Sequence, residues 1–295
     1  MKRNALRKRE TLMGYVFLAP TLIGFILFMA FPFVASLILA FSKWNMMSGL
    51  QGIQFIGLEN FSKMFVSRNF GTAIKNNLLI SATTVPVTLL ISLVIAYLLN
   101  EVVYMKKTIR VIYFVPYICN IVATSIVWKL LFRTDGPINS ILYSLGVSEV
   151  PRWLASTQYA MIPILALTVW MGIGYDMVIY MAALQNIPTD LYEAGELDGA
   201  IGIRRFIHIT IPMLSPTTYF LVVTRMIMSF QIFSSINIIT QGALKTTVLV
   251  YEVYKEAFIS YKFGYGSAIA WILFLIILAI TLIQMWTEKK WVTYV

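Results

Sequence analysis

The sequence predicts an all-α membrane protein, a polytopic bundle of six transmembrane helices with both termini on the cytoplasmic side. Of its 295 residues, 59% are apolar and only 12% are charged, and the mean hydropathy is +0.79. A soluble domain usually carries about 25% charged residues. A chain so poor in charge could not cover its own surface with polar groups, so most of it is expected to lie in lipid.

Six stretches are long and apolar enough to cross a membrane, because a spanning helix needs about 20 mostly apolar residues. They are predicted at residues 14–41, 78–99, 109–132, 159–183, 213–234 and 267–286. Pro212 and Pro216 stand at the start of the fifth stretch, where first-turn N–H groups have no helical partner to lose. The first stretch is too long for the core of a secretion signal, so a retained helix is expected.

The distribution of basic residues predicts the orientation of the chain in the membrane. An even number of spans puts both termini on one side, and with both inside, the inner segments carry more Lys and Arg than the longer outer loops. Cytoplasmic segments characteristically hold this excess. Before the first span stands a basic cluster of Lys2, Arg3, Arg7, Lys8 and Arg9. The predicted orientation is therefore cytoplasmic for both termini.

The composition argues against several other classes. The net charge of +10 comes from short basic runs beside apolar stretches, not from a basic stripe with interleaved aromatics, so nucleic acid is not an expected partner. Cys119 stands alone, which excludes an intrachain disulfide, and it is interpreted as a small buried apolar residue. His208 has no nearby Cys or second His, so no metal site is predicted. The spans contain no cluster of catalytic residues, which argues against a membrane-embedded enzyme.

The longest predicted inner connection, residues 184–211, joins the fourth and fifth spans. Ordered sequence of that length usually has a function of its own. Pro188 is expected to end the preceding helix. Asp190 then caps a new helix, with Glu193 three residues later as in a capping box.

Gly199 and Gly202 are expected to end this helix, and a second short helix is predicted over residues 204–209. The result is a helix-turn-helix at the membrane surface, whose small residues allow another protein's backbone to come close. The alternative is an amphipathic helix resting on lipid. The acidic first half of the loop argues against that alternative, because the inner leaflet is anionic.

The loop resembles the EAA loop of binding-protein-dependent ABC-importer permeases. That pattern is Glu-Ala-Ala, three residues, Gly, nine residues, Ile, one residue and Leu-Pro. The chain matches it at Glu193, Ala194, Gly199, Ile209 and Pro212. It departs at Gly195, where the pattern has its second Ala, and at Ile211, where it has Leu. Glycine at that point weakens a helix by about 1 kcal/mol relative to alanine.

The resemblance extends over nearly the whole chain. Residues 182–200, 18–44 and 57–61 are similar to carbohydrate-type permeases of the maltose and glycerol-phosphate group, within the type I (MetI-like) family. The resemblance implies a permease domain at residues 72–287. Before it come the N-terminus, the first helix and an outer loop (1–71), and after it a cytoplasmic tail (288–295). It also implies the cytoplasmic membrane of a bacterium or archaeon.

The resemblance further implies partners and a docking loop. A coupling helix between the fourth and fifth spans would sit in a cleft of a separate cytoplasmic ATP-binding subunit dimer. A second related permease and an extracytoplasmic solute-binding protein, which delivers a sugar or oligosaccharide, would complete the transporter. The docking residues implied are Asp190, Glu193, Ala194, Gly195, Asp198, Gly199, Ala200, Phe206, Ile209 and Pro212.

The chain itself has no phosphate-binding loop of the form Gly-x-x-x-x-Gly-Lys-Ser/Thr. It is therefore not expected to be an enzyme. ATP and Mg²⁺ would bind to the partner ATPase, and this chain would bind no cofactor of its own.

Charges inside spans are costly and are candidates for function. Asp176 is predicted roughly 10 Å and Arg225 roughly 18 Å above the inner membrane face, at 1.5 Å per residue. A structural ion pair is the first interpretation, and a substrate or gating role remains open. Trp170, at the level of Arg225, could offer an aromatic face to a sugar ring, although packing within the bundle explains it as well. Further candidates for substrate contact are Tyr175, Ser229 and Gln231.

A second function is kept open, an ion-coupled secondary transporter with Asp176 as the coupling carboxylate. Such transporters often show inverted repeats and paired broken helices. The sequence shows no such symmetry, and six spans would be few for that class.

Overall fold

The computed structural model describes residues 2–45, 47, 49–101 and 106–293. It is mostly helical and consists of two compact units. The first unit comprises Met1–Val66 with Val253–Trp271, and the second comprises Ser67–Glu252 with Ile272–Val295. These units are defined by compactness, whereas the domain boundaries in the sequence analysis came from the family resemblance. Those boundaries stay a prediction.

The first unit begins with one long apolar helical segment that contains a π-helical turn. Helix α1 (Lys2–Phe25) continues through η1 (Ile26–Ala30) into α2 (Phe31–Ala40). Pro32 has no N–H to donate. The helix widens just before Pro32, because the Phe31 N–H bonds to the carbonyl oxygen of Ile26, five residues back. The first predicted span is present in this segment.

After α2 the chain forms a small sheet that the all-helical prediction did not include. Strand β1 (Ser42–Lys43) pairs antiparallel with β2 (Gln54–Phe55), with η3 (Leu50–Gly52) between them and α3 (Glu59–Val66) after them. The buried amide of Asn60 in α3 donates to the carbonyls of Ala40 and Ser42, each at 2.9 Å. Asn60 thereby satisfies the last carbonyl of α2, which has no helical partner, and ties the start of β1 to α3.

The start of the last helix packs against α2 within the same unit. Helix α15 (Phe263–Glu288) follows α14 (Leu249–Tyr254) and η5 (Lys255–Ile259). The Trp271 indole N–H donates to Ser36 Oγ at 3.2 Å, and its ring lies 4.6 Å from that of Phe33. The Trp271 ring therefore joins the two apolar helices of this unit side by side.

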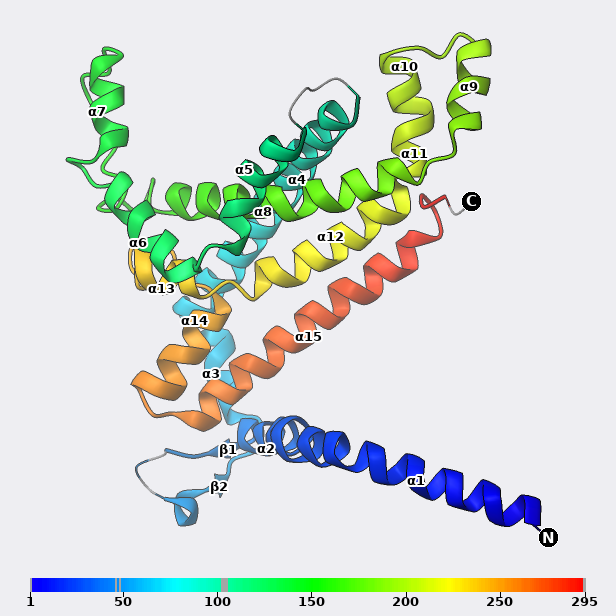
Figure 1. Cartoon of the computed structure of the whole chain (residues 1–295). Coiled ribbons are helices and arrows are strands. Elements are labelled where there is room, and N and C mark those ends of the chain that lie inside the picture. The colour runs from blue at the N-terminus through cyan, green and yellow to red at the C-terminus, as the bar shows by residue number, and fades with distance from the viewer. Residues whose placement is uncertain (1, 46, 48, 102–105, 294–295) are drawn as a thin grey trace. The chain divides into compact units, whose positions relative to one another are not determined.

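The second unit is a helical bundle (Figure 1), in which α4 packs against α8 and α12, and α5 packs against α8. Its core is a continuous buried cluster that includes Leu89, Met177, Tyr180 and Leu221. Its further helical elements are α4 (Arg68–Glu101), α5 (Lys106–Ile118), α6 (Ile121–Leu131), α7 (Pro137–Ser144), α8 (Met161–Gln185), α9 (Thr189–Leu197), α10 (Ile203–Arg205), η4 (Phe206–Thr210), α11 (Ile211–Met213), α12 (Ser215–Phe230) and α13 (Ser234–Ile239).

The predicted third span is wrong as a single helix. Helices α5 and α6 meet at 97°. Asn120 takes an extended backbone conformation, and its side chain accepts hydrogen bonds from the N–H groups of Val122 and Ala123 at 2.8 and 3.3 Å. It is the N-cap of a new helix, which is the position that asparagine favours. Cys119 at the bend is exposed, not buried as predicted.

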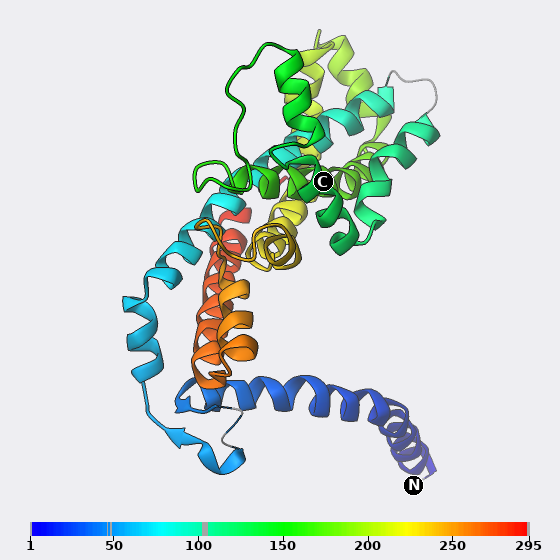
Figure 2. The same ribbon diagram turned by 90° about the vertical axis from the view of Figure 1, so that its left-hand side faces the viewer.

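The other predicted spans match long apolar helices. In the described part of the chain five helices are long and apolar enough to cross a membrane, and the α5–α6 pair is a sixth candidate. The predicted fifth span corresponds to Ser215–Ile239, which a non-helical turn between α12 and α13 interrupts. The C-terminal tail lies beside the start of α12, where Thr293 N–H donates to Ser215 Oγ at 2.9 Å. The inner loop also ends there, and Figures 1 and 2 show α9 and α10 beyond that end of α12.

We expect Gly174→Ala to destabilise the packing of α5 on α8. A Cβ atom built at Gly174 would overlap the carbonyl oxygen of Tyr113, a backbone atom that cannot turn away. Overpacking of this kind typically costs about 1–3 kcal/mol. The measurement is the thermal unfolding midpoint of the purified protein in detergent.

The matched control is Gly71→Ala in α4. A Cβ there meets nothing within 4 Å, and alanine favours a helix by about 1 kcal/mol over glycine. The control should therefore melt at the wild-type temperature or above. Equal midpoints for both variants would contradict the close approach of α5 to α8.

Candidate functional site

The inner loop between α8 and α12 begins differently from the prediction. Helix α9 starts at Thr189 with Pro188 as its N-cap residue, and no side chain caps it. The predicted cap at Asp190, and with it the capping box to Glu193, is therefore wrong. Pro188 already has the extended backbone that an N-cap residue needs, so Asp190 falls inside the first turn. There its negative charge is stabilised by the positive, N-terminal end of the helix dipole.

Helix α9 ends just before Gly199, as predicted, but Gly202 does not end this helix. Gly199 has a φ of +76°, and the N–H groups of Gly199 and Ala200 bond back to the carbonyls of Glu196 and Gly195 at 3.0 and 2.7 Å. This pair of bonds is the Schellman motif, which favours glycine because of the left-handed backbone. Gly202, with a φ of +56°, then starts the second short helix.

Gly195, the departure from the EAA pattern, is buried against the second half of the loop. A Cβ atom at this position would contact the Cδ1 atom of Ile209. The space that the second alanine of the pattern would fill is therefore occupied here by the terminal methyl group of Ile209. Glycine and isoleucine together close the helical hairpin.

Aromatic contacts fix the loop to the bundle. The ring of Phe206 lies 4.5 Å from that of Tyr97 on α4. The Tyr192 hydroxyl is hydrogen-bonded to the Thr210 hydroxyl at 3.3 Å, and the guanidinium of Arg205 lies 5.4 Å from the Tyr192 ring. These contacts give the short helices a defined position at the end of the unit, which propensity alone would not provide.

The opposite face of the loop is exposed and mixes acidic with apolar side chains. Among the predicted docking residues, Asp190, Glu193, Ala194, Asp198 and Gly199 are exposed, whereas Ala200, Phe206, Ile209 and Pro212 are half-buried and Gly195 is buried. Leu197 is 91% exposed, and Ile201 and Ile203 are also exposed. An exposed apolar patch of this kind commonly marks a protein interaction surface.

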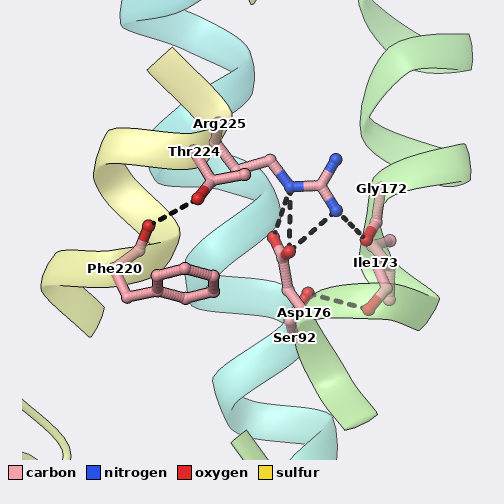
Figure 3. Close-up of polar contacts among 7 residues, drawn as sticks. All are labelled: Ser92, Gly172, Ile173, Asp176, Phe220, Thr224 and Arg225. Atoms are coloured by element: carbon pink, nitrogen blue, oxygen red, sulfur yellow. Dashed lines mark hydrogen bonds and ion pairs between the residues drawn. The ribbon is translucent and has the colours of Figure 1, made fainter. Parts of the chain in front are cut away.

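Asp176 and Arg225 form the ion pair that the sequence predicted. Figure 3 shows the guanidinium of Arg225 reaching from α12 to Asp176 on α8. Nε lies 2.8 and 2.9 Å from the two carboxylate oxygens, and Nη2 lies 2.7 Å from Oδ1 and 2.7 Å from the carbonyl oxygen of Gly172. The side chain of Asp176 is fully buried, so the pair satisfies a charge that lipid would not tolerate alone.

Small residues bring α4 and α8 close around this pair. The Ser92 hydroxyl of α4 donates to the carbonyl of Ile173 at 3.1 Å. A Cβ atom at Gly172 would lie 2.8 Å from Thr88 and 3.1 Å from Arg225 Nη1. Small residues at helix contacts allow the backbones to approach in this way. Gly172 therefore leaves room for the guanidinium.

Arg225 also lines a cavity of about 320 Å³, which we call the Arg225 cavity. A smaller cavity of about 90 Å³ shares Thr168, Arg225, Met228 and Ile232 with it and adds Ser229 and Thr84. The Arg225 cavity is lined mostly by hydroxyl-bearing, aromatic and apolar side chains. They include Tyr117, Thr168, Met171, Phe233, Ser234 and Ser235.

The predicted substrate candidates fall into two groups. Arg225 and Ser229 line the cavities, and Tyr175 stands next to them, with its ring 5.6 Å from the Arg225 guanidinium and 5.0 Å from the Tyr117 ring. Trp170 instead stacks on Trp128 at 5.2 Å, and Gln231 is exposed at the end of α12. The lining residues of neither cavity include these last two side chains.

Several cavity residues were missed by the sequence analysis. Tyr117, Ser234 and Ser235 belong to α5 and α13, on either side of breaks that the prediction treated as continuous helix. One signal was available for α4. Its buried hydroxyl residues recur at helical spacing, at Ser81, Thr84, Thr88 and Ser92. A polar stripe of this kind along an apolar helix indicates the face turned to the bundle interior.

A multi-pass helical bundle with a structured surface loop between two spans and a polar cavity between its helices has the features of a membrane transport protein. Residues 90–292 match the family described as binding-protein-dependent transport system inner membrane component. The chain belongs to this family. It is a multi-pass permease subunit of an ABC importer, and the family that the sequence analysis named is confirmed.

The relatives match over their whole length. The probable ABC transporter permease protein YesP of Bacillus subtilis is 33% identical over 300 residues, covering 100% of this chain and 96% of that protein. The lactose transport system permease protein LacF of Rhizobium radiobacter is 28% identical, with 98% of each chain covered. A chain of the bacterial alginate ABC transporter, in complex with an alginate pentasaccharide-bound periplasmic protein, superposes with a TM-score of 0.83 at 25% identity, covering 96% of both chains.

We expect Asp176→Asn to destabilise the second unit strongly. The substitution leaves the Arg225 guanidinium, only 13% exposed, without its counter-charge, and breaking a buried pair in this way costs about 3–5 kcal/mol. Thermal unfolding of the purified variant in detergent measures the loss.

The double variant Asp176→Leu/Arg225→Met tests the pair itself. It removes both charges and leaves apolar side chains, so it should recover most of the lost stability. If the double variant lost as much stability as the two single variants together, the result would contradict the pairing.

Proposed function

We propose that this chain forms one half of the membrane pathway of an ATP-driven sugar importer. In this assembly a cytoplasmic ATP-binding subunit dimer docks on the α9–α11 loop. An extracytoplasmic binding protein delivers a sugar or oligosaccharide, and a second related permease supplies the other half of the pathway. The observation that carries the proposal is the loop, which is fixed to the bundle on one face and exposes acidic and apolar residues on the other.

The loop is suited to passing on a movement of the docked subunit. It is continuous with α8 at one end and with α12 at the other. Glu193 and Ala194 on its exposed face supply a charge and a small side chain to a partner. Gly195 and Ile209 hold the two short helices together. The loop should therefore move as a rigid body when a docked subunit displaces α9.

The Arg225 cavity suits a polyhydroxylated cargo. The hydroxyl-bearing residues Thr168, Ser234 and Ser235 and the aromatic residues Tyr117 and Phe233 line a space of about 320 Å³. Small-molecule sites combine an apolar and aromatic wall with a few placed polar groups in this way. Lactose and alginate, named for the relatives above, are carbohydrates, which is in keeping with this assignment.

Energy would come from the partner. ATP and Mg²⁺ would bind to the ATP-binding subunits, and this chain would bind no cofactor. Among the residues that the structure describes, no group of three or more His, Cys, Asp and Glu side chains could hold a metal ion.

Ion coupling through Asp176 is the second function considered. Both oxygens of its carboxylate accept hydrogen bonds from Arg225, and its side chain is fully buried. A coupling carboxylate must exchange its ion or proton with water during transport. The hydrogen bonds from Arg225 to both carboxylate oxygens favour a structural role over ion coupling.

We expect Glu193→Lys to weaken docking of the ATP-binding subunit by roughly tenfold or more, because like charges placed opposite each other cost several kcal/mol. The measurement is the amount of that subunit retained on the tagged permease, together with ATP-driven uptake in proteoliposomes. Glu149→Lys, the same change at an exposed residue of a predicted outer loop, is the control.

Wild-type docking and uptake in the Glu193→Lys variant would contradict the docking-loop assignment. Uptake that persists without the ATP-binding subunit but stops with a protonophore would support ion coupling instead.

We expect Thr168→Val to raise the KM for sugar uptake about fivefold, since one hydrogen bond contributes about 1 kcal/mol. Thr168 lines both cavities, and the variant should dock the ATP-binding subunit normally. Thr224→Val is the matched control. Both hydroxyls bond a carbonyl four residues back, at 2.8 and 2.9 Å, but Thr224 lines neither cavity. An equal KM for both variants would place the sugar elsewhere.

A further inference from the structure

The first unit contains a cavity of about 490 Å³, and none of its lining residues belongs to the inner loop or to the Arg225 cavity. We call it the lysine cavity. It is lined by Lys43, Trp44, Asn45, Ile56, Asn60, Lys63, Glu256, Lys262 and Tyr265. All of these residues belong to the same compact unit, so the cavity is complete within it.

The lysine cavity lies where two membrane helices meet the surface. Lys43 and Trp44 follow the end of α2 at Ala40, and Lys262 and Tyr265 flank the start of α15 at Phe263. An antiparallel β-bridge between the backbones of Asn45 and Lys262 joins the two segments. Trp, Tyr and Lys are the side chains that favour the boundary between hydrocarbon and water. The cavity therefore stands at head-group level, on the predicted outer side.

Its charges leave a positive surplus. Lys63 pairs with Glu59 at 2.5 Å, and Lys262 lies 3.6 Å from Glu256. Lys43 makes no ion pair within the described part of the chain. Hydrogen bonding and the charge of Lys63, with a smaller contribution from Lys43, hold the pKa of Glu59 below its usual value. Lys63 and Lys262 therefore have acidic partners, and Lys43 supplies the positive surplus.

One acceptor in the lysine cavity is left without a donor. Glu256 Oε2 is buried and accepts no hydrogen bond from the described residues, and its only close cation is Lys262 at 3.6 Å. A buried acceptor without a donor is costly. A ligand for this cavity should therefore bring a negative charge for the lysines and a hydroxyl group for Glu256.

We propose that the lysine cavity binds the head group of an anionic membrane phospholipid, with its phosphodiester at Lys43 and a head-group hydroxyl at Glu256. Phosphatidylglycerol has this chemistry, a single negative charge beside free hydroxyls. Lysine binds phosphate as a point charge. The apolar side chains of Val34, Leu37 and Ile38 are exposed on α2, the helix that ends shortly before Lys43, and they offer a surface for the acyl chains.

An acidic side chain of an extracytoplasmic protein would meet the same lysines but would bring no hydroxyl donor for Glu256. Free phosphate shares the charge but lacks the acyl chains that the exposed face of α2 would hold. The position at head-group level and the unsatisfied carboxylate oxygen together favour the lipid.

The test is native mass spectrometry of the full-length protein, delipidated in mild detergent and then given phosphatidylglycerol, phosphatidic acid or phosphatidylcholine with the same acyl chains. Wild type should retain phosphatidylglycerol best. Lys43→Gln should lower its retention about fivefold, while Lys43→Arg should keep it. Lys75→Gln removes the same charge from an exposed residue of α4 that does not line the cavity, and it should bind as wild type.

Glu256→Ala should reduce the preference for phosphatidylglycerol over phosphatidic acid without abolishing binding of either. Equal retention by Lys43→Gln and Lys75→Gln would overturn the proposal, as would equal retention of phosphatidylcholine by wild type. Displacement of the lipid by millimolar inorganic phosphate would assign the cavity to a free anion. If Lys43→Gln weakened only capture by the extracytoplasmic binding protein, the cavity would be a protein-docking site and the lipid assignment would be wrong.

Discussion

The ion pair between Asp176 and Arg225 is the constraint on which the second unit depends. A lone charge among apolar helices is expensive, and its removal from water is tolerated only with a partner at hydrogen-bond distance. Arg225 meets this requirement by bonding Asp176 and the Gly172 carbonyl of α8 at once. Helices α8 and α12 are therefore joined in the middle of the bundle. The α9–α11 loop joins the same two helices at one end, so the loop and the cavity lie on one connected frame.

Proline shapes a helical segment in each of the two units. The π-helical segments η1 and η4 each stop two residues before a proline, Pro32 and Pro212. In each, the N–H of the residue before the proline bonds to the carbonyl five residues back. Proline itself has no N–H with which to continue the hydrogen-bond pattern of an α-helix. Extra width of this kind in a helix often occurs where function needs it. The first residue of η4, Phe206, is the one whose ring packs on Tyr97 of α4.

The sequence predicted what depends on local patterns and missed what depends on tertiary contacts. The membrane spans and the Asp176–Arg225 pair follow from apolar length and from the fixed rise of a helix. The break at Asn120 was missed because it lies inside a continuous apolar run, and only the bonds to Val122 and Ala123 reveal its capping role. The Arg225 cavity was predicted only in part, since Tyr117 and Ser235 are distant in sequence and meet through the bends that broke the expected helices.

The residues that match the EAA pattern divide into two kinds by their contacts. Glu193 and Ala194 are exposed and contribute to the outer surface of the loop, whereas Gly199 turns the chain and Ile209 packs inward. The pattern thus describes both a docking face and the support that holds it. Gly195 belongs to the support, because the Ile209 methyl group lies where an alanine side chain would stand. The departure from the pattern therefore changes how the hairpin is closed and leaves its exposed face unchanged.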